Sequence, residues 1–197
     1  QTGQLELICE NEESLGSAVG SDCQYGSGKQ SQQHSLGFLS VHTLGHTDEI
    51  RCLKADGTWQ SLIQIAGSIQ ALAADEDKLW MIAMEHQNLP EVFCFDLKTK
   101  QNRQVTAFNS SVLKDCYVAQ PEALRIRAGD FQVDGWVLKP IDYDPNQKYP
   151  AILNIHGGPK AAYGTVFFHE MQYWASQGYF VLFCNPRGSN GKGNAFA

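Results

Sequence analysis

The amino-acid sequence predicts an all-β part of a β-propeller, about two and a half blades long, followed by the first part of an α/β-hydrolase domain. Two observations predict this fold class. Short strand-like segments repeat at a fixed offset within the first half of the chain. In the second half, the apolar run 151–155 leads directly into His156-Gly157-Gly158-Pro159, a strand-to-loop pattern typical of α/β-hydrolases.

The repeat in the first half has an offset of 42 residues. Residues 38–41 return as 80–83, and residues 49–53 return as 91–95. In each repeat unit, the later of these two segments leads through a polar turn into one more short strand. A unit of about 40–50 residues with four short strands is typical of a propeller blade.

The predicted blades do not form a complete ring. Residues 3–8 resemble the outer strand of a preceding blade, so we count two blades and the tail of a third. Propellers use roughly 4–8 blades, so the ring requires polypeptide beyond this chain. A small β-sandwich of about seven or eight strands is the alternative that the repeat leaves open.

A linker at 109–120 separates the C-terminal propeller blades at 1–108 from the hydrolase portion at 121–197. In that portion, alternating residues predict two strands joined by a turn, and apolar residues at helical spacing predict a helix that ends at Gly178. A strand–helix–strand order predicts a parallel crossover. The expected elements are strands 122–128 and 131–139, a strand 149–155 covered on both faces, a helix 167–177 and a buried strand 179–184.

Composition and charge exclude several classes of function. The net charge is −6 and Lys/Arg residues never exceed two in a row, so we expect no nucleic-acid binding. No apolar run approaches the roughly 20 residues of a membrane-spanning helix, so we expect no membrane association. None of the six cysteines forms a Cys-x-x-Cys pair, which favours a reduced, cytoplasmic protein. The missing initial Met indicates that the chain begins within a longer protein.

We expect no metal and no cofactor. His and Cys residues do not cluster at ligand spacing, and the glycine-rich segments 157–160 and 188–193 lack the frame of a nucleotide-binding loop. Most histidines are expected on the surface, and three aspartates are expected in turns rather than at a calcium ion. These residues are His34, His42, His46, His86 and His169, with Asp22, Asp48 and Asp75.

In this order and spacing, several segments together resemble the prolyl oligopeptidase family of serine peptidases, most closely its acylaminoacyl-peptidase and dipeptidyl-peptidase-like branch. The resemblance covers most of the chain. The segments that carry it are 21–26, 89–92 with 104–109, 121–122 with 134–140, 156–159, and 185–189 with Gly191 and Gly193.

The resemblance implies a serine peptidase that hydrolyses short peptides or acyl-peptides through a Ser-Asp-His triad. No Gly-x-Ser-x-Gly occurs in the 197 residues, so the nucleophile, base and acid are expected beyond this chain, which alone should be inactive. The resemblance also implies that the backbone N–H of Gly158 is one donor of the oxyanion hole. His156, Gly157 and Pro159 are expected to support that loop.

Two further polar residues, His156 and Arg187, follow predicted strands. His156 precedes the position of the nucleophile, whereas the α/β-hydrolase order is Ser, Asp, His, so we do not expect it to be the base. Arg187 follows a predicted parallel strand, where ligands gather in open α/β sheets, so it is a candidate for shaping the site.

The expected partners are a peptide substrate and the remainder of the same hydrolase domain, and self-association into a homo-oligomer stays open. Two alternative functions also remain. One is a β-propeller binding module without catalysis, and the other is an esterase with the α/β-hydrolase fold.

Overall fold

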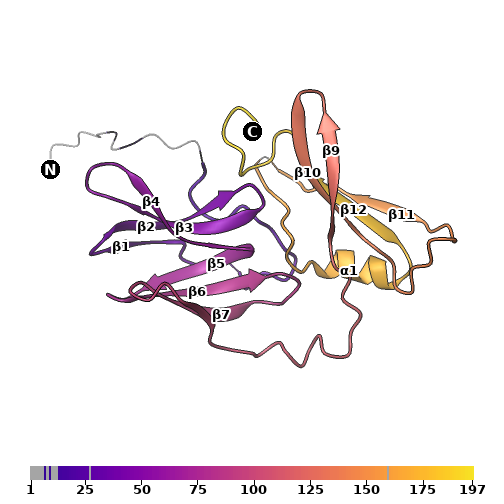
Figure 1. The fold of residues 1–197 in the computed structure, drawn as a ribbon, viewed down its shortest axis with the longest axis horizontal. Helices are drawn as coiled ribbons and strands as arrows, with labels where there is room; N and C mark the ends of the chain where they lie inside the picture. Colours follow the sequence, from indigo (N-terminus) through magenta and orange to yellow (C-terminus); the bar gives the residue numbers. More distant parts are fainter. Residues whose placement is uncertain (1–6, 8, 10–12, 27, 159) are drawn as a thin grey trace.

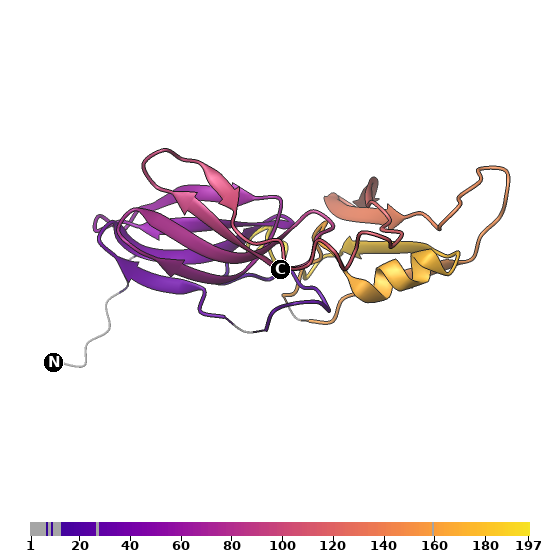
Figure 2. The same cartoon turned by 90° about the horizontal axis from the view of Figure 1, so that it is seen from below.

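The computed structural model describes residues 7, 9, 13–26, 28–158 and 160–197. It contains three four-stranded sheets and one helix among these residues. Two antiparallel sheets lie side by side at one end of the molecule, and the third sheet lies with the helix at the other end (Figures 1 and 2). The strand predicted at 3–8 falls almost entirely outside the described residues.

The two antiparallel sheets are the two predicted blades. In each sheet the strands pair in chain order, as an up-and-down blade requires. The offset of 42 residues superimposes the second and third strands of one blade on those of the next. The first blade consists of β1 (Ser31–His34), β2 (Gly37–Leu44), β3 (Thr47–Leu53) and β4 (Trp59–Ile65), and the second of β5 (Gly67–Ala74), β6 (Lys78–Glu85), β7 (Glu91–Asp96) and β8 (Asn102–Gln104).

An apolar core joins the two blades face to face. Its fully buried members include Leu39 and Ile50 from the first blade, and Ile69, Leu79 and Met81 from the second. Burial of this surface favours the paired arrangement by roughly 25 cal/mol per Å² of apolar area.

Two polar residues in the first blade are buried, so the predictions for them were wrong. Asp48 lies within β3 rather than in a turn, and its carboxylate accepts hydrogen bonds from the Thr43 hydroxyl (2.7 Å) and the Ile69 amide (2.8 Å) of the next blade. Burial raises the pKa of Asp48 to about 6. His42 is also fully buried, its ring packs edge-on against Trp59, and burial lowers its pKa to about 4.

The third sheet has the strand order β11-β12-β10-β9. The hairpin β9–β10 is antiparallel, whereas β11 and β12 are parallel and are connected through α1, which confirms the predicted crossover. The face that carries Trp136, Val181 and Phe183 packs against Met171 and Ala175 of the helix. The elements are β9 (Glu122–Ala128), β10 (Phe131–Leu138), β11 (Ala151–Asn154), α1 (His169–Ser176) and β12 (Phe180–Asn185).

The prediction that both faces of the strand at 149–155 are covered is wrong for this chain. Leu153 and Ile155 have exposed fractions of 61% and 66%. β11 is the edge strand of the sheet and α1 covers the opposite face, so no described residue shields these two side chains.

Residues that precede the first blade contact the hydrolase portion directly. The amide of Gly20 donates to the Ala162 carbonyl, and the amide of Ala162 donates to the Ala18 carbonyl, both at 3.0 Å. The Asp22 carboxylate accepts from the amides of His169 (2.6 Å) and Glu170 (2.7 Å). Asp22 therefore satisfies two free amides at the start of α1, where a negative charge is favoured.

Within the part of the chain that the structure describes, no helix has the length and apolar character needed to cross a membrane.

Candidate active site

The carboxyl end of the parallel strands is the edge of the third sheet where ligands bind in open α/β folds. The segments 155–158 and 186–193 leave β11 and β12 at this edge. Because β10 is antiparallel to β12 and Asp134 pairs with Asn185, the start of β10 extends past the end of β12. The tip of the β9–β10 hairpin therefore lies at the same edge as both loops.

The His156 side chain connects the two loops. Its Nε2 atom lies 2.8 Å from the hydroxyl oxygen of Ser189, and its Nδ1 atom lies 2.8 Å from the carbonyl oxygen of Gly157. Its ring packs edge-on against Tyr163 at a centroid distance of 5.2 Å. These contacts fix the course of the chain immediately before the two glycines.

Gly157 and Gly158 are exposed at the sheet edge. Among the described residues, the Gly158 amide donates no hydrogen bond, so its N–H is free to meet a ligand. A Cβ atom at Gly157 would have open space, and one at Gly158 would lie 3.4 Å from the Lys160 amide nitrogen. The role of Gly158 in an oxyanion hole stays a prediction, and Pro159 lies outside the described residues.

A buried polar cluster behind the loop joins the ends of the two parallel strands. The Asn185 side chain accepts from the Tyr163 amide (2.7 Å) and donates to the Tyr163 carbonyl (2.8 Å). The Tyr163 hydroxyl in turn bonds the side-chain oxygen of Asn154 at the end of β11. Burial raises the pKa of Tyr163 to about 12, so its hydroxyl keeps its proton at neutral pH.

The sequence reasoning missed this cluster. Its visible signal is that both apolar strands end in asparagine, at Asn154 and Asn185. Side-chain amides at these positions can bond backbone groups of a loop that leaves the sheet.

Arg187 is exposed at the same edge, and its guanidinium lies over the ring of Phe131 at 4.8 Å from the centroid. It thereby connects the loop after β12 to the hairpin. Its predicted part in shaping the site stays a prediction. Among the described residues, no group of three or more His, Cys, Asp or Glu side chains could hold a metal ion.

Comparisons with known proteins match both halves of the chain. The sequence model described as "Prolyl oligopeptidase family" matches residues 165–197. The chain is 39% identical over 98 residues to "Uncharacterized peptidase YuxL" of Bacillus subtilis, covering 49% of this chain and 15% of that protein. It is 30% identical over 145 residues to "Dipeptidyl-peptidase 5" of Trichophyton schoenleinii, covering 72% of this chain and 19% of that protein.

Solved structures show the same architecture. An acylaminoacyl peptidase in complex with Z-Gly-Gly-Phe-chloromethyl ketone superimposes with a TM-score of 0.78 at 27% identity, covering 94% of this chain and 27% of that one. Pyrococcus horikoshii acylaminoacyl peptidase gives a TM-score of 0.75 at 30% identity, covering 85% of this chain and 26% of that one. These matches confirm the predicted fold class, and they show that the chain spans a small part of its relatives' length.

Proposed function

Sequence and structure support the prolyl oligopeptidase family for this chain, and on that premise we propose that the parent protein is a serine peptidase acting on short peptides or acyl-peptides. The observation that carries the proposal is the Gly158 amide. It is exposed, lacks a hydrogen-bond acceptor among the described residues, and follows a parallel strand at the ligand-binding edge of the sheet.

In the proposed reaction, a serine beyond this chain attacks the substrate carbonyl carbon while a histidine, oriented by an aspartate, takes the hydroxyl proton. The carbonyl electron pair moves onto oxygen, and the Gly158 N–H donates to that oxyanion. The histidine then returns the proton to the leaving amine, and water hydrolyses the acyl-enzyme. This chain supplies the donor and the loop that holds it, and we expect no activity from the chain alone.

Substitution at Gly158 tests this role in the full-length protein. Gly158→Pro removes the N–H, and the loss of one oxyanion donor should lower kcat by about 100–1,000-fold. Gly158→Ala is the matched control, because it keeps the amide and its Cβ atom would make an ordinary 3.4 Å contact with the Lys160 amide nitrogen. Unchanged kcat in Gly158→Pro, or an equal loss in Gly158→Ala, would contradict the proposed role.

We also propose that the remainder of the hydrolase domain covers β11. The exposed side chains of Leu153 and Ile155 on this edge strand support the proposal, because apolar edge strands are usually paired or covered.

The choice of substrate separates peptidase from esterase function. Turnover of an acyl-peptide should exceed turnover of a p-nitrophenyl ester by the full-length protein. Turnover of the ester alone would identify an esterase, and no turnover of either would favour a binding module.

A further inference from the structure

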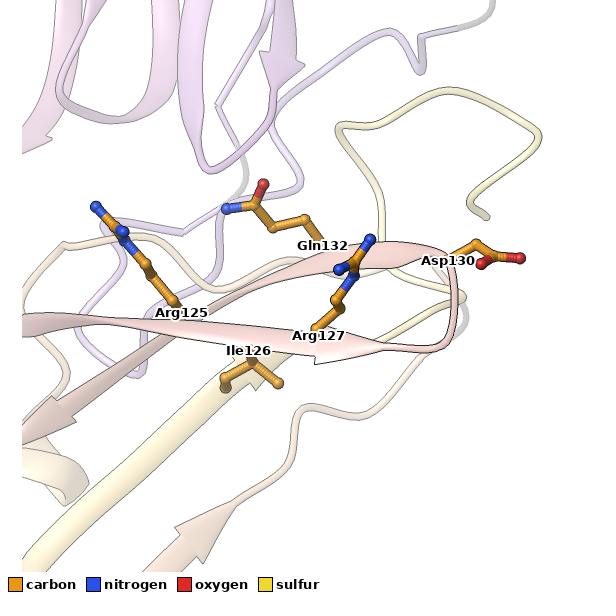
Figure 3. Close-up of a pocket in the computed structure, with 5 residues that line it drawn as sticks. All are labelled: Arg125, Ile126, Arg127, Asp130 and Gln132. Atoms are coloured by element: carbon orange, nitrogen blue, oxygen red, sulfur yellow. The ribbon is translucent and has the colours of Figure 1, made fainter.

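A concave site lies on the β9–β10 hairpin, at the edge of the sheet that carries the candidate active site. It has a volume of about 390 Å³ and is lined by Arg125, Ile126, Arg127, Asp130 and Gln132. Figure 3 shows the two arginines and Gln132 projecting from one face of the hairpin, while Ile126 projects from the other.

The strand register explains why these side chains share a face. Arg125 pairs with Asp134, and Arg127 pairs with Gln132. Directly opposed residues of an antiparallel pair project to the same side, and so do residues two apart along a strand. The register therefore places both guanidinium groups beside Gln132 and Asp134.

The carboxylate that could neutralise Arg125 is bound elsewhere. Asp134 lies 2.9 Å from the ammonium of Lys192 and 3.7 Å from Nδ1 of His46. Within the part of the chain that the structure describes, neither Arg125 nor Arg127 forms an ion pair. Asp130 lies at the hairpin tip, and its carboxylate is directed away from both guanidinium groups (Figure 3). The site is thus locally cationic in a chain whose net charge is −6.

One loop connects this cationic site to the Gly158 loop. In the loop after β12, the Ser189 side chain contacts His156. On either side of Ser189, the Arg187 guanidinium lies over Phe131 of the hairpin, and Lys192 donates to the Gln132 carbonyl at 3.1 Å. An extended peptide with its reacting carbonyl at Gly158 can therefore reach the hairpin along the same edge.

We propose that Arg125 and Arg127 form a subsite that binds a carboxylate of the peptide substrate. This inference rests on the proposed peptidase function. A guanidinium presents two parallel N–H donors that match the two oxygens of a carboxylate, and the Gln132 amide supplies a further donor on the same face. The carboxylate is either the free C-terminus of the peptide or an acidic side chain near it.

The test measures how the full-length protein turns over three related peptides: a C-terminal acid, the corresponding C-terminal amide, and the same amide with one residue near the C-terminus replaced by Glu. The double variant Arg125→Gln/Arg127→Gln should raise KM for the acid peptide about tenfold, with kcat unchanged, because two solvent-exposed charge pairs are lost. KM for the plain amide should not change. Arg103→Gln, at an exposed arginine of β8, is the matched control and should leave all three KM values unchanged.

The pattern across peptides identifies the source of the carboxylate. A KM increase restricted to the acid peptide assigns the C-terminal carboxylate, and an increase for the Glu peptide assigns an acidic side chain. Unchanged KM values for both the acid peptide and the Glu peptide in the double variant, or an equal loss on all three peptides, would overturn the subsite.

Direct binding separates the subsite from the proposed function. Fluorescence anisotropy of the three labelled peptides measures Kd without turnover. A preference for the acid peptide or the Glu peptide over the plain amide that disappears in the double variant supports the subsite even if no peptide is cleaved, whereas failure of cleavage alone counts against the peptidase function. Equal Kd values for all three peptides would overturn the subsite.

Discussion

Replacing Asn185 with leucine should destabilise the protein strongly, because one buried side chain satisfies two backbone groups. Asn185 is 1% exposed, and its amide bonds both the N–H and the C=O of Tyr163. Leucine keeps the branching of asparagine but is larger and has no hydrogen-bonding atoms, so both backbone groups would lose their partners. An unsatisfied buried polar group costs about 1–3 kcal/mol, which gives a loss of about 2–6 kcal/mol for the pair.

Urea unfolding of the full-length protein measures this loss. With a slope of about 1–3 kcal/mol per molar urea, the midpoint should fall by at least about 0.7 M. Asn102→Leu is the control, since Asn102 is exposed on β8 and the same change there should alter stability by less than about 0.5 kcal/mol. If Asn185→Leu shifted the midpoint no more than Asn102→Leu, the buried bonds to Tyr163 would not contribute as described.

Two further predictions concern Asp22 and Asp48. Asp22→Ala should lower the free energy of unfolding by about 1 kcal/mol, because α1 loses the carboxylate that accepts from its first amides. Asp22→Asn should lower it less. Equal unfolding midpoints for Asp22→Ala and the unsubstituted protein would contradict this role. Burial raises the pKa of Asp48 to about 6, so the folded state retains a proton that the unfolded state releases near pH 4. The contribution of Asp48 to stability should therefore fall as pH rises from about 4 to 6, whereas His42, whose pKa is lowered to about 4, contributes in the opposite direction. The stability of Asp48→Asn relative to the unsubstituted protein should rise across this range, and equal differences in urea unfolding at pH 4 and pH 6 would contradict the raised pKa.

The sequence predicted the elements whose pattern is local. The repeat of 38–41 at 80–83 located β2 and β6, and the apolar spacing of Phe167, Met171 and Ala175 located α1. A periodic pattern reports which face of one element is apolar, so it identifies strands and helices without knowledge of their neighbours.

The sequence did not predict features that depend on a distant partner. Asp48 is buried because the amide of Ile69 in the next blade reaches it, and Asp22 caps a helix that begins 147 residues later. Neither contact produces a periodic sequence pattern around the aspartate, so the sequence near Asp22 or Asp48 does not indicate it. The alternation of Arg125, Ile126 and Arg127 predicted the strand 122–128, but it did not identify the two arginines as a site.

The attachment of Ala18–Asp22 to the hydrolase portion limits how the two domains can move. The polypeptide crosses between them once through the connector after β8, and the backbone bonds at Ala162 form a second tether at a separate point. Further hydrogen bonds cross the interface elsewhere, from the Gln87 side chain to the Thr165 carbonyl (2.8 Å) and from the Gly45 amide to the Gly191 carbonyl (2.6 Å). Opening of the interface must therefore break several separated contacts together.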